Sequence, residues 1–120
     1  ANILESIALG IDMFDCVIPT RNGRNGWLFT KNGIINIKNE KWKEDFSPIE
    51  PDGDVPADNE YSKAFLRHLF VAREMLAPMT ATVHNLGFYM WLMRESRKNI
   101  MAGTFTGWKE IMVKQLMQRI

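Results

Sequence analysis

The first part of the chain constrains the fold most, because its hydrophobic period changes from helical to strand-like across one glycine. Apolar residues recur at the spacing of a helical face at Ile3, Leu4, Ile7 and Ala8. Gly10 follows as a C-terminal cap, and residues 11–17 form a short apolar run that Pro19 stops. A helix, a glycine and a buried strand form the repeating unit of parallel α/β proteins. We therefore predict an α/β fold in which residues 11–17 are a strand.

The rest of the chain predicts a different local arrangement. Residues 20–26 are polar and are predicted to be a loop, and Asn32 and Gly33 separate two apolar runs, which predicts an antiparallel hairpin. Residues 40–59 contain three prolines and several acids without periodicity, so they are predicted to be an irregular connection that needs support. Apolar residues at helical spacing predict three helices, at 61–76, 81–102 and 106–120.

Composition limits the class of protein. With 120 residues the chain forms one domain or part of one, and its formal charge of +1 gives no basic field, so any anion site must be local. Its one cysteine, Cys16, excludes an internal disulfide and is typical of a reducing compartment. The longest apolar stretch, near 86–93, is too short to cross a bilayer. We expect a cytoplasmic protein without membrane contact, cut from a longer chain because it begins at Ala1 within a helical pattern.

Asp15 is a carboxylate near the C-terminal end of the predicted strand. In α/β barrels this end of the strand carries the catalytic residues. A buried acid that caps the following loop is the structural alternative, and the local residues leave both interpretations open.

Two arginines follow in the predicted polar loop, Arg21 and Arg24. Guanidinium groups bind phosphates and guanine edges in bidentate fashion, so the pair could hold nucleic acid. Solvated side chains on an exposed loop are the alternative. Spacing and residue type alone do not decide between them.

Four stretches together carry a family resemblance: "GIDMFDCVIPTRNGRNG", "FSPIEP", "EYSKAFLRHL" and "VHNLGFYMWLM". In this order and spacing they resemble the C-terminal third of bacterial queuine-type tRNA-guanine transglycosylases, over essentially the whole chain. The resemblance implies a TIM (β/α)8 barrel with an insertion, normally zinc-binding, between its last strand and last helix. Because a barrel needs eight strands and about 250 residues, the chain would be a C-terminal fragment, inactive alone.

The resemblance also implies a division of the chain. Residues 1–26 would be the end of barrel helix 7, barrel strand 8 and the catalytic and RNA-contact loop. Residues 27–79 would be the inserted subdomain, with a β-hairpin, an irregular loop and a helix. Residues 80–120 would be C-terminal helices that close the subdomain and the barrel.

The activity implied is the exchange of the wobble guanine of tRNA for a 7-deazaguanine base, a pentosyl transfer in queuosine biosynthesis. Asp15 matches the nucleophile that attacks the anomeric carbon of ribose, a role that suits a carboxylate as in retaining glycosidases. Thr20, Arg21 and Arg24 match residues that contact the anticodon loop. The second acid lies upstream in the family, and a homodimer is implied.

The insertion departs from the family pattern. Gly53, Val55 and Asp58 occupy the places of three cysteine ligands, and His84 alone remains of the four. Thiolates supply most of the affinity of structural zinc sites, so we predict that no zinc and no other cofactor is bound. His84 is then predicted to be a core histidine that bonds backbone at a helix start, and Asp58 to be the N-cap of the helix near residue 61.

Two further possibilities concern the same loop. A hard-metal site from Asp52, Asp54, Asp58 and Glu60 is disfavoured, because the acids lack a glycine at the calcium-binding spacing. Packing is the support that we predict instead. The residues expected to supply it are Trp42, Phe46, Pro48 and Pro51.

A second function class stays open, a non-catalytic tRNA-binding or subunit-interaction paralogue of the same fold. A paralogue freed from catalysis would be expected to lose Asp15 or the two arginines. All three are present, which favours the enzyme.

Overall fold

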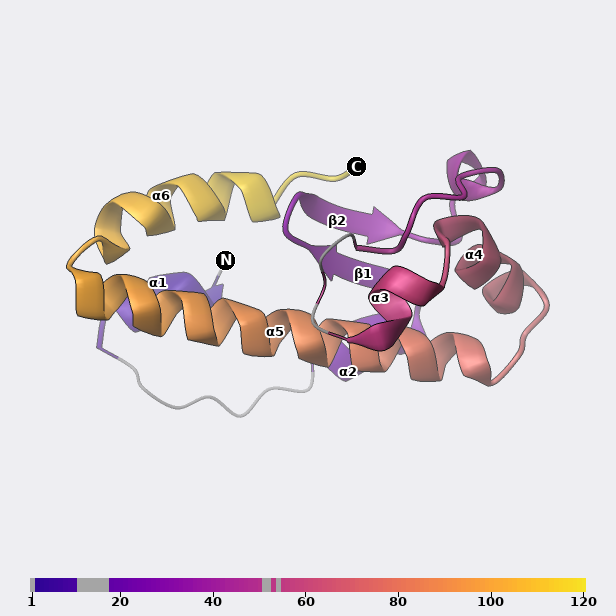
Figure 1. Cartoon of the computed structure of the whole chain (residues 1–120), viewed down its shortest axis with the longest axis horizontal. Coiled ribbons are helices and arrows are strands. Elements are labelled where there is room, and N and C mark those ends of the chain that lie inside the picture. The colour runs from indigo at the N-terminus through magenta and orange to yellow at the C-terminus, as the bar shows by residue number, and fades with distance from the viewer. Residues whose placement is uncertain (1, 11–17, 51–52, 54) are drawn as a thin grey trace.

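One long helix supports the whole molecule, which measures 45 × 25 × 22 Å. The structure, a computed structural model, describes residues 2–10, 18–50, 53 and 55–120. Helix α5 (Leu76–Ala102) runs along the long axis, and helices α1 (Asn2–Ala8) and α6 (Phe105–Leu116) lie beside its C-terminal half (Figure 1). The hairpin and the short helices lie along its N-terminal half. Two groups of elements are therefore held together by one helix.

The predicted hairpin is confirmed, with its turn one residue earlier than expected. Strands β1 (Trp27–Thr30) and β2 (Gly33–Asn36) pair antiparallel. Lys31 and Asn32 form the turn, and Gly33 opens β2 with a φ of 138°. Of Asn32 and Gly33, only the glycine has a positive φ.

Gly33 is required by its surroundings as well as by its φ. A Cβ atom at this position would collide with the backbone carbonyl of Gln118, which accepts a hydrogen bond from the Ile34 N–H at 2.7 Å. Ile34 and Arg119 form a parallel bridge at the same place. The C-terminal tail therefore lies directly against β2.

The prediction of a loop at 20–26 is wrong over most of its length. Residues 18–24 form helix α2 (Ile18–Arg24), which packs against α5. Gly23 permits the close approach, since a Cβ there would lie 2.9 Å from the backbone nitrogen of Thr82. Proline, asparagine and glycine give this segment a low helix propensity, so tertiary packing rather than local preference stabilises the helix.

Helix boundaries agree with the sequence where a glycine ends the helix. Gly10, with a φ of 96°, follows α1, and Gly103, with a φ of 75°, caps α5, as predicted. The predicted strand at 11–17 lies outside the described residues. Helix α6 ends at residue 116 rather than 120.

The helices predicted at 61–76 and 81–102 are both present, but the break between them lies earlier in the chain. The first is shorter, α4 (Lys63–Val71), and a turn with Arg73 at a φ of 58° follows it. The second begins at Leu76, because Pro78 falls in the first turn, where no intrahelical donor is needed. The irregular region before them holds only two short helices, η1 (Glu40–Trp42) and α3 (Pro56–Glu60).

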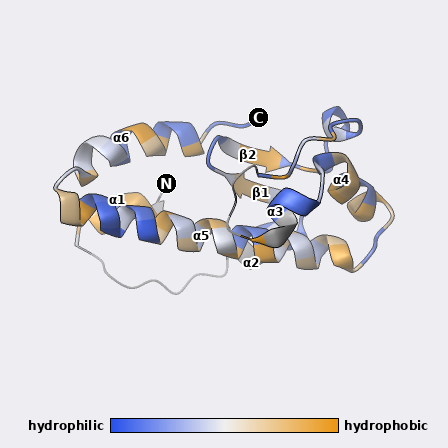
Figure 2. Ribbon diagram, viewed as in Figure 1, coloured by the Kyte–Doolittle hydropathy of each residue, from blue (hydrophilic) through white to orange (hydrophobic). Residues whose placement is uncertain are grey.

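Two buried clusters share α5, which shows both hydrophobic and hydrophilic residues along its length (Figure 2). The first cluster joins the hairpin, α4 and the start of α5: Leu28, Ile35, Ile37, Trp42, Ile49, Leu66, Leu69, Ala77 and Ala81. The second joins α1, α6 and the later part of α5: Leu4, Phe88, Leu92, Met112 and Leu116. Among the described residues, no helix is long and apolar enough to span a membrane.

Candidate functional site

The structure places only some of the predicted RNA-contact residues. Asp15 lies outside the described residues, and Thr20 lies in α2. Arg21 and Arg24 occupy the last turn of α2, and both are exposed. Residues three apart share one face of a helix. The two guanidinium groups are therefore presented together at the surface.

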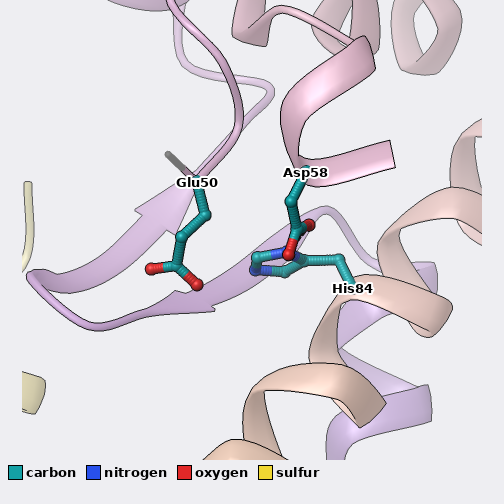
Figure 3. A group of neighbouring side chains, drawn as sticks. All are labelled: Glu50, Asp58 and His84. Carbon is teal, nitrogen blue, oxygen red and sulfur yellow. Dashed lines mark hydrogen bonds and ion pairs between the residues drawn. The ribbon is translucent and has the colours of Figure 1, made fainter. Parts of the chain in front are cut away.

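A second group of polar side chains is buried beneath the hairpin. Glu50, Asp58 and His84 come from the loop after η1, from α3 and from α5, and they point toward one another (Figure 3). Their nearest ligand atoms all lie within 4.8 Å, and no other such group of three is found in the described part of the chain. Glu50 was missed from the sequence, because an acid in an aperiodic loop gives no signal.

His84 uses both ring nitrogens. Its Nε2 lies 2.7 Å from the carbonyl oxygen of Phe29, and its Nδ1 lies 2.5 Å from Oδ1 of Asp58. A carbonyl can only accept, so Nε2 donates, and Nδ1 faces a carboxylate. Burial lowers the pKa of His84, but the hydrogen bond and the charge of Asp58 outweigh it, so the pKa is raised overall. Because Nε2 donates to the carbonyl, a proton must lie between Nδ1 and the Asp58 carboxylate.

These contacts decide two predictions. The prediction that His84 is a core histidine bonded to backbone is confirmed, although its helix begins at Leu76 and not at residue 81. The prediction that Asp58 caps a helix is wrong. Ser62 is the N-cap of α4, and its hydroxyl accepts a hydrogen bond from the Phe65 N–H at 3.1 Å.

Glu50 connects the buried polar group to the hairpin. Its Oε2 accepts a hydrogen bond from the backbone N–H of Lys31 at 2.7 Å. Burial raises the pKa of this carboxyl group, partly offset by the Lys31 hydrogen bond and by the charge of His84. The Glu50 N–H in turn donates to the Asp58 carbonyl at 3.1 Å, so loop and α3 are joined through backbone as well.

Asn85, the neighbour of His84, binds the same strand. Its Oδ1 accepts from the Phe29 N–H at 3.0 Å, and its Nδ2 donates to the Trp27 carbonyl at 2.9 Å. The amide thereby takes the place of a neighbouring strand along β1. His84 and Asn85 together fix α5 to the hairpin.

Comparison with known proteins decides the family. The family described as Queuine tRNA-ribosyltransferase matches residues 1–118. The chain belongs to this family. The protein named queuine tRNA-ribosyltransferase from Aquifex aeolicus is 47% identical over 119 residues, 99% of this chain and 32% of that protein. Its namesake from Clostridium acetobutylicum is 48% identical over 114 residues, 95% of this chain and 30% of that protein. The chain thus spans about a third of the length of these relatives.

Membership of the queuine tRNA-ribosyltransferase family raises the question of zinc, which the resemblance implies for the insertion. Gly53 offers no side chain and Val55 an apolar one, so only Asp58 and His84 remain at the four ligand positions. Nδ1 and Oδ1 of these two are 2.5 Å apart. A tetrahedral zinc with bonds near 2.0–2.1 Å would hold its ligand atoms roughly 3.3 Å apart. Even with Glu50 as a third donor, the group has no thiolate, and the Nδ1–Oδ1 spacing is too short for a shared ion, so the residues present do not fit a structural zinc.

The packing predicted for this loop is confirmed only in part. Trp42 is buried in the first cluster, and Pro48 pairs with Ser62 in an isolated antiparallel bridge. Phe46 is 78% exposed, so the prediction that it packs on the loop is wrong. Pro51 lies outside the described residues. Aromatic packing therefore supports the start of this region, and the buried polar group supports its end.

Proposed function

We propose that this chain is the C-terminal part of a tRNA-guanine transglycosylase, which replaces the wobble guanine of tRNA by a 7-deazaguanine base. The family match over residues 1–118, whose description names tRNA ribosyl transfer, is the observation that carries this proposal. In the intact protein, residues 11–17 would form the last strand of a TIM barrel. The protein would act as a homodimer in the cytoplasm, where its tRNA substrate is found.

Asp15 is proposed as the nucleophile. A carboxylate oxygen attacks C1′ of the ribose, the bond between C1′ and the guanine nitrogen breaks, and guanine leaves with the bonding electrons. The incoming base then attacks C1′ and releases the carboxylate. Two displacements at one carbon retain its configuration, as in retaining glycosidases. The acid that handles the protons would lie upstream of this chain.

Thr20, Arg21 and Arg24 are proposed to hold the anticodon loop while this exchange proceeds. Support comes from the two arginines, which are exposed on one face at the end of α2. Unstacked bases of a single-stranded loop offer edges and phosphates to such side chains.

A covalent-adduct experiment on the full-length protein tests the function. Wild-type protein incubated with tRNA should give a protein–RNA adduct on a denaturing gel. Asp15→Asn has the same shape without the nucleophilic charge, so it should bind tRNA and give no adduct. Glu110→Gln, a change of an exposed acid on α6, is the control and should give the adduct. Adduct from Asp15→Asn would refute this role. A wild-type protein that binds tRNA without any adduct would instead favour the non-catalytic paralogue.

A further inference from the structure

The loop that in the family would be held by metal is held in this chain by contacts among its own residues. Its ends are joined through backbone, where Glu50 N–H donates to Asp58 C=O and Asp58 N–H donates to Val55 C=O, both at 3.1 Å. Backbone bonds within the loop do not attach it to α5. Among the described residues of the loop, positions 53, 55 and 58 make or admit the side-chain contacts with α5.

The absence of a side chain at residue 53 is what admits the carboxylate of Asp58. A Cβ atom built on Gly53 would lie 2.6 Å from Cβ and 2.7 Å from Cγ of Asp58, and it would collide with the carboxylate itself. Contacts under about 3 Å between such atoms require displacement. A residue larger than glycine at 53 would therefore push Asp58 away from His84.

Val55 makes the apolar half of the attachment. Its Cγ1 lies 2.7 Å from the position of a Cβ on Gly87, so the valine side chain packs into the gap that this glycine leaves on α5. Gly87 is one helical turn from His84, on the same side of α5. Val55 therefore contacts Gly87 and Asp58 contacts His84, while Gly53 leaves the space that the Asp58 side chain occupies.

We propose that the ion pair of Asp58 and His84, admitted by Gly53 and flanked by the Val55–Gly87 contact, replaces zinc as the link between the loop and α5. The distance of 2.5 Å between Nδ1 and Oδ1 leaves no room for an ion between them, and Nε2 is already committed to the Phe29 carbonyl. Opposite charges compensate each other where water is excluded. A buried pair adds little net stability over apolar packing, but removal of one partner leaves an uncompensated charge. The pair therefore specifies this arrangement of loop and helix.

Metal content gives the first test. Full-length protein is purified without chelator from zinc-supplemented cells, and zinc is measured by elemental analysis in wild type and in His84→Ala. We expect no stoichiometric zinc, and a thermal midpoint that 1,10-phenanthroline does not change. One zinc per wild-type chain that is absent from His84→Ala would overturn the proposal.

The charge of Asp58 gives the second test. Asp58→Asn keeps the shape and removes the anion, so we expect the thermal midpoint to fall by roughly 10 °C without recovery on addition of zinc. Glu60→Gln, which changes an exposed acid of the same helix, is the matched control and should leave the midpoint unchanged. A midpoint for Asp58→Asn equal to that of wild type would overturn the proposal.

Two further measurements test the proposal if Asp58→Asn does not fold. The nitrogen chemical shifts of His84 in wild-type protein should show both ring nitrogens protonated at neutral pH, and a bare nitrogen would contradict the ion pair. Gly53→Ala should lower the midpoint in the wild-type background but much less in the Asp58→Gly background, because the collision is with the Asp58 side chain from its Cβ outward. Equal effects in the two backgrounds would also overturn the proposal.

Discussion

His84 on α5 donates a hydrogen bond of 2.7 Å to the Phe29 carbonyl on β1, so a helix side chain completes the outer edge of a strand. This donation commits Nε2 and leaves only Nδ1 to face Asp58. A histidine that must donate from both nitrogens has to remain protonated. The attachment of α5 to Asp58 of α3 is thereby tied to a proton.

Stability should consequently fall as the pH rises past the ordinary range of histidine. The charged groups around His84 are Asp58 from α3, Glu50 from the preceding loop and, through Glu50, Lys31 of the hairpin. Because the pKa of His84 is raised in the folded protein, its contribution is complete below its unfolded pKa of about 6.5 and is lost as the pH rises through the folded pKa. The measurement is the thermal midpoint between about pH 6 and pH 9.

Two variants separate the groups that contribute to the fall of the thermal midpoint with pH. The pKa of Glu50 is also raised, so its contribution has the same sign, and Glu50→Gln removes it. Asp58→Asn removes the anion that raises the pKa of His84, and it should flatten the decline. A wild-type profile as flat as that of Asp58→Asn would show that the proton does not matter.

Asn85→Asp should destabilise the protein although the side chain hardly changes in size. An aspartate cannot donate to the Trp27 carbonyl, and it adds a charge where residue 85 is fully buried. The expected loss is about 1–3 kcal/mol in the free energy of unfolding, measured by denaturant titration. Asn25→Asp, at an exposed position, should change it by less than about 0.5 kcal/mol. Similar losses in both variants would mean that the bonds to β1 are unimportant.

Two glycines in helices should respond in opposite directions to alanine. Gly23→Ala introduces a Cβ whose nearest neighbours are backbone atoms of α5, at 2.9 Å from Thr82 N, so a loss of about 1–3 kcal/mol is expected. Gly107 in α6 has nothing within 4 Å of the same atom, and Gly107→Ala should stabilise by about 0.5–1 kcal/mol. Denaturant unfolding of each variant measures the change in the free energy of unfolding. A neutral Gly23→Ala would show that α2 and α5 can separate without cost.

The arginines of α2 should govern the salt dependence of tRNA binding by the full-length protein. Arg21→Ala and Arg24→Ala should each weaken binding and reduce the slope against salt by about one phosphate contact. Lys98→Ala is the control, since this exposed lysine lies about 24 Å along α5 from Thr82, where α2 packs. An unchanged slope in both arginine variants would indicate that the arginines are merely solvated.

The sequence predicts those parts of the fold that depend on local signals. Glycines that end α1 and α5, and the hairpin between two apolar runs, require only a few neighbouring residues. Helix α2 could not be predicted, because its stability comes from contact with α5 far along the chain. Glu50 could not be predicted because its aperiodic loop gives no signal. The resemblance places Asp58 and His84 in one ligand set, but their direct contact appears only in the folded chain.

The C-terminal tail has a consequence for how the hairpin meets other chains. The Ile34 N–H donates to Gln118, and the Ile34 carbonyl accepts from the Ile120 N–H at 3.0 Å, so the outer edge of β2 is occupied. His84 and Asn85 occupy the outer edge of β1 in the same way. A strand edge with unpaired groups is a template for aggregation with a second copy. Both edges of this small sheet are closed by segments of its own chain, which protects a two-stranded hairpin from pairing with a neighbour.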